Sequence, residues 1–449
     1  MDHAGSAFIR RTYAHFASTG VPLDGVADGE EYTRNCNEPV WEQPPSSADA
    51  PEHADSFPKP LQERLACVDR YGFFDGSAGS RMAQNVLPRA AYLKGRSVRR
   101  VGETCTLRAV DPEPTLEARG RNTAARAREI HRIEKWAHML VSHAAVHGTN
   151  PSENEQIGSG DQYRLTAPPT QLQRRVYKGV PDRWRAAAWA ALAAEHSKSD
   201  QVAAAKSCDT LQLQPSEHDV QIDLDVPRTM RGHVQFHTRY GGGQRGLFSV
   251  LHAASLMCSE CGYCQGMGPL AAMLLCYLAP TDAYALLVQL HDDYHFHDFF
   301  RPGFPGLREM FYVQQRLTNA FLPNLDSAMR ANGVVPSAYA TSWYMTLFSN
   351  TLPFATQLRV WDALLLDGRD VLLYVALAIL HALAPRTSKE NAADWLLEAL
   401  SAPQLPEDDD ALMRWVQSAL HDRRARAVVE EARRDWSALS QTEQESLFL

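Results

Sequence analysis

The sequence predicts an all-α protein, and three observations lead to this prediction. From about residue 172 to residue 400, apolar side chains recur at helical spacing in one segment after another. These segments are bounded by glycine, proline, asparagine or aspartate, which commonly stop helices. The chain shows neither a fixed internal repeat nor an alternation of strands with helices. We therefore expect helices packed on one another in one or two lobes.

The first 124 residues are predicted to form a low-complexity, largely disordered extension. The segment NEPVWEQPPSSADAPEHADSFPKP is acidic and rich in proline, serine and alanine, which is typical of a disordered linker. A short aromatic island, DRYGFFDGS at 69–77, has little around it to pack with. The charge turns basic between 89 and 132. We favour a solvated, partly helical lead-in there over a contact with anionic lipid.

Ordered structure is expected to begin near residue 125. The segment AREIHRIEKWAHMLVSHAA places Ile130, Ile133, Trp136 (or Ala137) and Leu140 on one face, which predicts an amphipathic helix. A polar loop follows it. The next helix is expected after Pro181, because proline suits the first turn of a helix and helix-favouring alanines follow.

The helical pattern then continues to about residue 436. Its segments are LFSVLHAASLMCSE, PLAAMLLCYLAP, AYALLVQLHDDY, LREMFYVQQRLTNAFLPNLDSAMRANG, SAYATSWYMTLFSN, LPFATQLRVWDALLLDG, DVLLYVALAILHAL, ADWLLEALSAPQ and DDDALMRWVQSALHDRRARAVVEEARRDW. The longest apolar stretch, 371–384, has fourteen residues and includes His381. That is too short to span a bilayer, so it predicts a buried helix.

Composition narrows the class of protein. The chain has 449 residues, of which 45% are hydrophobic and 22% charged, as in ordinary globular proteins. A net charge of -8 argues against a general nucleic-acid binder, which needs clustered cations. The eight cysteines are scattered, and the first residues lack the apolar stretch of a secretory leader. We expect a cytoplasmic protein with free thiols.

Three further patterns suggest a cofactor, and for each we favour a simpler interpretation. Gly241, Gly243 and Gly246 satisfy G-x-G-x-x-G, with Glu260 downstream, but a dinucleotide site needs a parallel sheet that the sequence does not offer. We expect a loop before a packed helix instead.

The second and third patterns could bind a metal. Cys258, Cys261 and Cys264 form C-x-x-C-x-x-C, which with Cys276 would suit an iron–sulfur cluster, although Cys258 and Cys261 also have the spacing of helical core residues. The run HDDYHFHDFF at 291–300 suits zinc or iron, although a solvated loop is favoured. We expect no metal site. The sequence also lacks the G-x-x-x-x-G-K-S/T motif of a nucleotide-binding P-loop.

The segment QIDLDVPRT presents one arginine from a stiff support. Pro227 disfavours a helix interior across Val226, so we expect a short extended or turn segment. Asp225 lies three residues before Arg228 and could hold its guanidinium through a forked contact. An ordinary surface ion pair of little energetic value is the alternative.

The segment ECGYCQGMGP separates two apolar helices with glycines and a proline. Tyr263 and Gln265 are left on a tight turn. A glutamine there can both donate and accept a hydrogen bond, which suits the orientation of a water molecule. The alternative is a turn residue that bonds its own backbone.

Three short motifs in this order resemble the TBC-domain GTPase-activating proteins for Rab-type small GTPases. The motifs are R-x-x-x-W at Arg185 and Trp189, I-x-x-D-x-x-R at Ile222, Asp225 and Arg228 followed by Thr229, and Y-x-Q at Tyr263 and Gln265. The resemblance extends from about residue 125 to residue 410. Met230 stands where an aromatic residue is usual, and MCSECGYC is unusually rich in cysteine.

The resemblance implies an all-helical, V-shaped domain over 125–436, with lobes at about 125–300 and 301–436 and a tail at 437–449. It also implies two catalytic residues. Arg228 would supply a cation, and Gln265 would orient the attacking water in the partner's site. Asp225, Thr229, Ile222 and Tyr263 would support them. Arg185 and Trp189 would be structural, as a helix surface that shapes the groove.

The resemblance further implies an activator rather than an enzyme with its own substrate. The partner would be a GTP-bound Rab-type GTPase that carries the GTP and Mg²⁺, so this chain would have no cofactor of its own. It would act in the cytoplasm, in vesicle trafficking, with peripheral association to endomembranes. A catalytically silent Rab-binding scaffold or effector and a redox enzyme are the alternatives.

Overall fold

The computed structural model describes residues 3–21, 71–73, 86–87, 127, 129–142, 163–196, 201–349, 351–386, 393–401, 403, 405–406 and 409–447. Within these residues helices dominate, which confirms the all-α prediction. The helices up to the middle of the chain are α1 (His3–Thr19), a helix at 129–137, α8 (Pro169–Val176), α9 (Asp182–His196), α10 (Gln201–Leu211), α11 (Asp219–Asp225), η3 (Val226–Arg228), α12 (Val234–His237), α13 (Gly242–Met257), α14 (Met267–Leu275) and α15 (Pro280–Asp292).

The second half of the chain continues in the same way. Its helices are α16 (His297–Phe300), α17 (Pro305–Phe321), α18 (Pro323–Ala331), α19 (Pro336–Met345), α20 (Phe354–Asp367), α21 (Val371–Leu383), η4 (Ala384–Arg386), α22 (Ala393–Ser401), α23 (Asp409–His421), α24 (Arg423–Ala438) and α25 (Gln441–Ser446). Two sequence segments expected as single helical stretches are broken into two helices each. Pro323 separates α17 from α18, and Asp422 caps α24 by accepting a hydrogen bond from the Ala425 amide at 2.8 Å.

Four very short strands complete the described chain. Strands β2 (Leu140–Ser142) and β3 (Tyr163–Leu165) pair antiparallel, with Leu140 opposite Leu165. Strands β1 (Val86–Leu87) and β4 (Leu405–Pro406) pair in parallel. Leu140 therefore belongs to a strand and not to the predicted amphipathic helix. In the helix at 129–137, Trp136 is buried as expected but Ile130 is 52% exposed.

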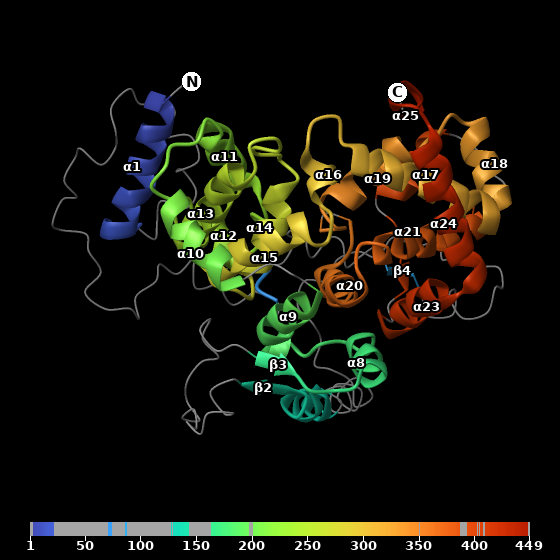
Figure 1. Ribbon diagram of the computed structural model, residues 1–449, viewed down its shortest axis with the longest axis horizontal. Helices are drawn as coiled ribbons and strands as arrows, with labels where there is room; N and C mark the ends of the chain where they lie inside the picture. The colour runs from blue at the N-terminus through green and yellow to red at the C-terminus, as the bar shows by residue number, and fades with distance from the viewer. Residues whose placement is uncertain are drawn as a thin grey trace, which may run out of the picture.

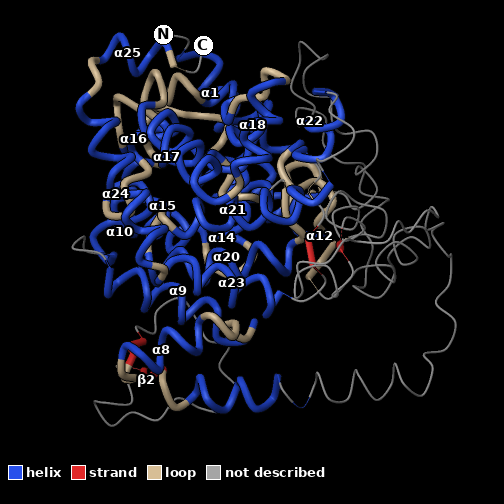
Figure 2. The backbone as a smooth tube through the Cα atoms, turned by 90° about the vertical axis from the view of Figure 1, so that its right-hand side faces the viewer, coloured by secondary structure: helices blue, strands red, loops and turns tan. Residues whose placement is uncertain are grey.

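The helices form two groups that lie side by side in Figure 1. Helices α10, α13, α14 and α15 pack together in one group, and α17, α21, α23 and α24 pack in the other. Helix α20 lies between the groups and packs on both α9 and α21. The turned view in Figure 2 shows α8 and β2 below these helices. The two-lobed arrangement expected from the sequence is confirmed.

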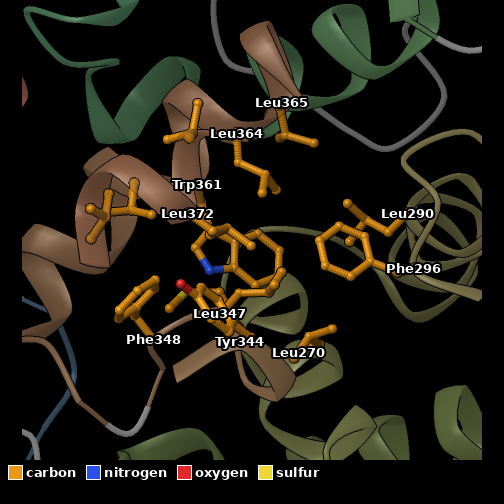
Figure 3. Packing of buried hydrophobic residues seen from close by; sticks show 14 of the residues in the cluster. Leu270, Leu290, Phe296, Tyr344, Leu347, Phe348, Trp361, Leu364, Leu365 and Leu372 are labelled. Atoms are coloured by element: carbon orange, nitrogen blue, oxygen red, sulfur yellow. The ribbon is translucent and has the colours of Figure 1, made fainter. Parts of the chain in front are cut away.

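One continuous hydrophobic core joins the two groups. Trp361 of α20 is fully buried, and Figure 3 shows it among apolar side chains from both sides. Leu270 and Leu290 reach this cluster from α14 and α15, whereas Tyr344 and Leu372 come from α19 and α21. Because the groups share this core, the surfaces that each presents are held in a fixed relation to one another.

Helix α21 confirms the buried helix predicted from the long apolar stretch. Each of its residues from Val371 to Leu380 is buried, whereas His381 is exposed. Within the part of the chain that the structure describes, no helix combines the length and the apolar character needed to cross a membrane.

Helix α1 lies where the sequence analysis expected only disorder. Ile9 and Tyr13 are buried, and Tyr13 stacks on Phe248 of α13 with ring centroids 4.0 Å apart. The Ser6 hydroxyl donates to Asp219 at 2.6 Å, and the Tyr13 hydroxyl donates to Asp223 at 2.9 Å. The packed face of α1 therefore mixes polar and apolar residues, so apolar periodicity alone did not reveal it.

The aromatic island also has packing partners that the sequence did not suggest. Phe73 is buried, and its ring lies 5.0 Å from that of Phe354 in α20. The Val234 amide donates to the Gly72 carbonyl at 2.8 Å, and Phe73 and His233 form an isolated antiparallel bridge. The remaining residues predicted to be disordered, including the basic stretch before residue 127, lie largely outside the described residues.

Candidate functional site

Of the extended or turn segment predicted around Arg228, the structure has the turn, and the residues before it are helical. Helix α11 ends at Asp225 and continues directly into the 3₁₀ turn η3. Pro227 fits within the first two positions of η3, where a missing N–H costs little. Thr229 closes the turn, since its amide and its hydroxyl both donate to the Asp225 carbonyl, at 3.1 and 2.8 Å.

Asp225 is the centre of the site. Its side chain is almost completely buried, and a buried carboxylate requires hydrogen-bond donors to offset the loss of water. Oδ1 accepts hydrogen bonds from the Arg228 guanidinium and from Gln221 Nε2, the latter at 3.1 Å. Oδ2 accepts from the Tyr263 hydroxyl at 2.8 Å. One carboxylate therefore ties the Arg228 turn to the loop that carries Gln265.

That loop runs between α13 and α14 and depends on a glycine. Gly262 has a φ of +55°, and a Cβ there would lie 2.4 Å from the His218 ring. Both the left-handed backbone and the close approach favour glycine at this position. Burial, and after it the hydrogen bond to Asp225, raises the pKa of Tyr263 well above its ordinary value. The hydroxyl therefore stays protonated and donates.

Gln265 is exposed at the end of this loop. Its backbone carbonyl accepts a hydrogen bond from the Gly268 amide at 3.3 Å. Among the described residues, none forms a hydrogen bond with its side-chain carboxamide, so the alternative of a side chain bound to its own backbone is not what the structure has.

Arg228 and Gln265 line the same cavity, which has a volume of about 570 Å³. The Arg228 side chain is 58% exposed, so its guanidinium contacts Asp225 while it faces the cavity. Thr229 and Arg231 add to this wall. The opposite wall comes from α19, α20 and their connection, with Met345, Phe354 and Gln357. Phe73, from the N-terminal extension, also lines the cavity.

Comparison with known proteins identifies the family. A family model for the Rab-GTPase-TBC domain matches residues 182–387. The TBC domain-containing protein C1778.09 of Schizosaccharomyces pombe is 34% identical over 307 residues, which cover 67% of this chain and 70% of that protein. The chain belongs to the Rab-GTPase-TBC domain family. Carabin of Mus musculus is 36% identical over 181 residues, and the match covers 40% of each protein.

Two solved structures share the fold. The crystal structure of the Chlamydomonas flagellar RabGAP TBC domain superposes with a TM-score of 0.51 at 23% identity, over 69% of this chain and 98% of that one. The Ypt/Rab-GAP domain of Gyp1p gives a TM-score of 0.51 at 18% identity, over 65% and 97%. The matched TBC segment contains Arg228 and Gln265, whereas Phe73 of the cavity wall lies outside it.

Two other motif residues lie inside the TBC domain and not on its groove. Trp189 is fully buried and Arg185 is 4% exposed, which suits the structural role expected of them, but neither belongs to an exposed helix surface that shapes the groove. Both donate to Oδ1 of Asp362 in α20, Trp189 at 2.8 Å and Arg185 at 3.3 Å. Arg185 also donates to the Val180 carbonyl at 2.6 Å and pairs with Asp182. These hydrogen bonds to Asp362 hold α9 against α20.

Ile222, the remaining residue of the second motif, is fully buried beneath the Arg228 turn. Its role is packing, and it does not line the cavity. Sequence reasoning missed the cavity residues that carry no motif, among them Arg231, Phe354 and Gln357. The aromatic island at 69–77 was the only sequence signal near Phe73. It could not show that Phe73 packs against Phe354, which lies far along the sequence.

The glycine and cysteine patterns have packing explanations in part. A Cβ on Gly243 would lie 2.0 Å from the Gln235 carbonyl, so this glycine allows α12 to approach α13. The only parallel strand pair among the described residues is the two-residue pair β1–β4, which is no dinucleotide fold. Cys276 lies against Met230, with the two sulfurs 3.9 Å apart, and so does not join Cys258 and Cys261.

Proposed function

We propose that this chain is a GTPase-activating protein for a Rab-type small GTPase in its GTP-bound form. The observation that carries the proposal is that an exposed guanidinium and an exposed carboxamide line one cavity, on two segments joined by a buried carboxylate. A relative of the same family supports it, since the Rab GTPase-activating protein tbc-11 of Caenorhabditis elegans is 29% identical over 213 residues. That match covers 47% of this chain and 23% of tbc-11.

Arg228 would act on the charge that develops during hydrolysis. Transfer of the γ-phosphoryl group spreads negative charge over its oxygens and the leaving oxygen, and a cation supplied by a second protein stabilises that charge. A guanidinium suits this task because it cannot lose its charge and presents parallel donors to phosphate oxygens. More than half of the Arg228 side chain is exposed, so it can reach into a bound partner.

Gln265 would act on the water. A carboxamide can accept a hydrogen bond from the attacking water and donate one to a phosphate oxygen at the same time, which aligns the water for attack. Its exposure and its place on the wall that also carries Arg228 support this role. The partner's own glutamine would then be dispensable for stimulated hydrolysis.

Asp225 and Tyr263 would position these two side chains. The carboxylate restrains Arg228 on one oxygen and Tyr263 on the other, so the two segments keep a fixed separation before a partner binds. Restraint of this kind reduces the conformational entropy that must be lost when the catalytic arrangement forms. Thr229 supports the same turn through its bonds to the Asp225 carbonyl.

GTP and Mg²⁺ would be carried by the partner, and this chain would need no cofactor for hydrolysis. The absence of a P-loop motif from the sequence supports this division. The protein would act in the cytoplasm during vesicle trafficking, in peripheral association with the endomembrane that holds its Rab partner.

The test is single-turnover phosphate release from a panel of GTP-loaded Rab proteins mixed with the full chain. We expect at least one Rab to be accelerated by about 10³-fold or more. Measurable binding without acceleration of any Rab would show a scaffold or effector instead. A responsive Rab whose own glutamine is replaced by leucine should still be accelerated. If that variant is not accelerated while the natural Rab is, the role of Gln265 fails and that of Arg228 stands.

A further inference from the structure

Two loops of the first group of helices bring four metal-binding side chains together. Cys258 and Cys261 lie just after α13, and His291 and His297 lie at the end of α15 and the start of α16. One ligand atom from each of these four residues lies within 4.8 Å of the others. Within the part of the chain that the structure describes, this is the group of cysteine, histidine and acidic residues that could hold a metal ion.

The distances within the group suit a tetrahedral metal. Cys261 Sγ lies 3.5 Å from His291 Nε2. Bonds of about 2.3 Å to sulfur and about 2.0 Å to nitrogen, at tetrahedral angles, place such a pair about 3.5 Å apart. The rings of His291 and His297 lie 4.8 Å apart and inclined at 67°, so neither ring stacks over the other.

The second nitrogen of His291 is held as it is in many metal sites. Its Nδ1 lies 2.6 Å from Oδ1 of Asp292, which leaves Nε2 directed at Cys261. A carboxylate that holds the far side of a histidine fixes the ring and raises its basicity toward the metal. The His297 ring is flanked by Glu260 and Asp298, at 3.4 and 3.9 Å.

The backbone of the cysteine pair is also preorganised. The Gly262 amide donates to the Cys258 carbonyl at 2.9 Å, which curls the C-x-x-C segment into a turn. His291 is 6% exposed, and both cysteines and His297 are half-buried. Two thiolates would neutralise a divalent ion, so the occupied site would add no net charge to this semi-buried position.

We propose that Cys258, Cys261, His291 and His297 bind one Zn²⁺ ion in a tetrahedral structural site. Four nitrogen and sulfur ligands leave no open coordination position for a substrate. Both cysteine thiols would lose their protons on binding, whereas both imidazoles bind as neutral ligands. A two-iron cluster with two cysteine and two histidine ligands is less suited, because its cysteines and histidines bind separate irons, whereas these four ligand atoms all lie within 4.8 Å of one another.

The site would anchor the loop that carries Tyr263 and Gln265. Cys261 lies two residues before Tyr263, and the metal would fasten it to the turn between α15 and α16. Asp225 holds the same loop from the other side through the Tyr263 hydroxyl. Zinc binding stands independently of the proposed function, since the same four residues would bind the metal whether or not any GTPase is activated.

The first experiment measures metal content and the cobalt spectrum of the full chain. After purification under reducing conditions with zinc present, the chain should retain about one zinc ion per molecule. Inductively coupled plasma mass spectrometry measures this metal content. After removal of zinc, added Co²⁺ should give the intense visible bands of a tetrahedral site with thiolate ligands. A chain that binds neither zinc nor cobalt, or that retains iron instead, would overturn the proposal.

Variants then test the ligand set. Cys261→Ser and His297→Gln should weaken zinc binding by about 100-fold or more, since they remove a ligand outright, and Asp292→Asn should weaken it by about 10-fold. Cys264→Ser is the matched control, because this cysteine lies in the same loop but outside the group, and it should bind as the natural chain does. Equal loss in the control, or an unchanged cobalt spectrum in Cys261→Ser, would contradict the assignment. Far-ultraviolet circular dichroism of each variant identifies any that fails to fold. If all variants fail to fold, the zinc content and cobalt spectrum of the natural chain still test whether it binds the metal.

Discussion

Two arginines of this chain each follow an aspartate by three residues, yet the fold places them in opposite environments. In the pair Asp182–Arg185, the arginine side chain is 4% exposed and the aspartate 36%. In the pair Asp225–Arg228, the aspartate is 2% exposed and the arginine 58%. The same spacing therefore produces a buried guanidinium in α9 and an exposed one in η3, directly after α11.

The difference lies in what else each guanidinium contacts. Arg185 uses its donors on Asp362, Val180 and Tyr277, inside the protein. Burial opposes the charge, but Asp362 and the other partners raise the pKa of Arg185 above its ordinary value. Arg228 contacts Asp225 alone among the hydrogen-bond partners described, and the rest of its fork faces the cavity. One arginine serves the fold, and the other is available to a partner.

The largest expected effect is the loss of activity in Arg228→Ala. Stimulated GTP hydrolysis should fall by roughly 10³-fold or more, because the cation that stabilises the transferred phosphoryl group is gone. The free energy of unfolding, from urea titration, should fall by only about 1–2 kcal/mol, because the buried Asp225 loses one donor but keeps those of Gln221 and Tyr263. A stable variant with full activity would contradict the assignment.

Arg330→Ala is the matched control for that variant. Arg330 is 57% exposed and pairs at 2.9 Å with Asp326, an aspartate that is 7% exposed, so its surroundings resemble those of Arg228. It lies in α18, and no residue of that helix lines the cavity. Activity should be unchanged, which separates the effect of the cavity from that of removing any exposed arginine.

Arg185→Ala should reverse the pattern. Its removal leaves the buried Asp362 with fewer donors, which should lower the free energy of unfolding by about 3–5 kcal/mol. Urea titration followed by circular dichroism measures this loss. At a temperature where the variant remains folded, stimulated hydrolysis should be close to that of the natural chain. A large fall in activity without a fall in stability would show that Arg185 contributes directly to the site.

Gln265→Ala should have a smaller effect than Arg228→Ala. Removing one preorganised hydrogen-bonding group that acts in the transition state costs on the order of 10²-fold in rate. Single-turnover phosphate release measures the rate, with the exposed Gln214 changed to alanine as the control. Equal rates for both variants would remove Gln265 from the mechanism.

Tyr263→Phe should give the smallest effect of the series. It deletes the hydroxyl that donates to Asp225 Oδ2 but keeps the ring, so stability should fall by about 1–2 kcal/mol. Because the Gln265 loop loses one tie and not its polar group, stimulated hydrolysis should fall less than in Gln265→Ala. A fall larger than that of Gln265→Ala would mean that the tyrosine itself contacts the partner.

The sequence predicted the helical architecture well, because long segments with apolar residues at helical spacing bury those residues by packing as helices on one another. The extent of α21 and the separation of α13 from α14 by a glycine-rich loop were both expected. Helix α1 was not expected, because Ser6 and Thr12 are buried beside Ile9 and Tyr13 and interrupt the apolar pattern. The α-helix from Asp219 to Asp225 was not predicted, whereas the turn at Pro227 was.

The motifs located the Arg228 and Gln265 segments, but spacing alone did not reveal how they meet. Gln221 and Tyr263 converge on Asp225 through folding contacts that no local pattern encodes. The burial of Arg185 depends in the same way on Asp362, which lies in a helix far along the chain. The group of Cys258, Cys261, His291 and His297 likewise arises only when two distant loops come together.

Phe73 has a practical consequence for anyone who works with a shortened form of this protein. The family match begins at residue 182, yet this ring supplies part of the opening into which a bound GTPase would have to fit. A fragment trimmed to the match would keep Arg228 and Gln265 but lose the part of the cavity wall that Phe73 supplies. The selectivity among GTPases measured on such a fragment would be that of the altered cavity, even if its stimulated rate equalled that of the intact chain.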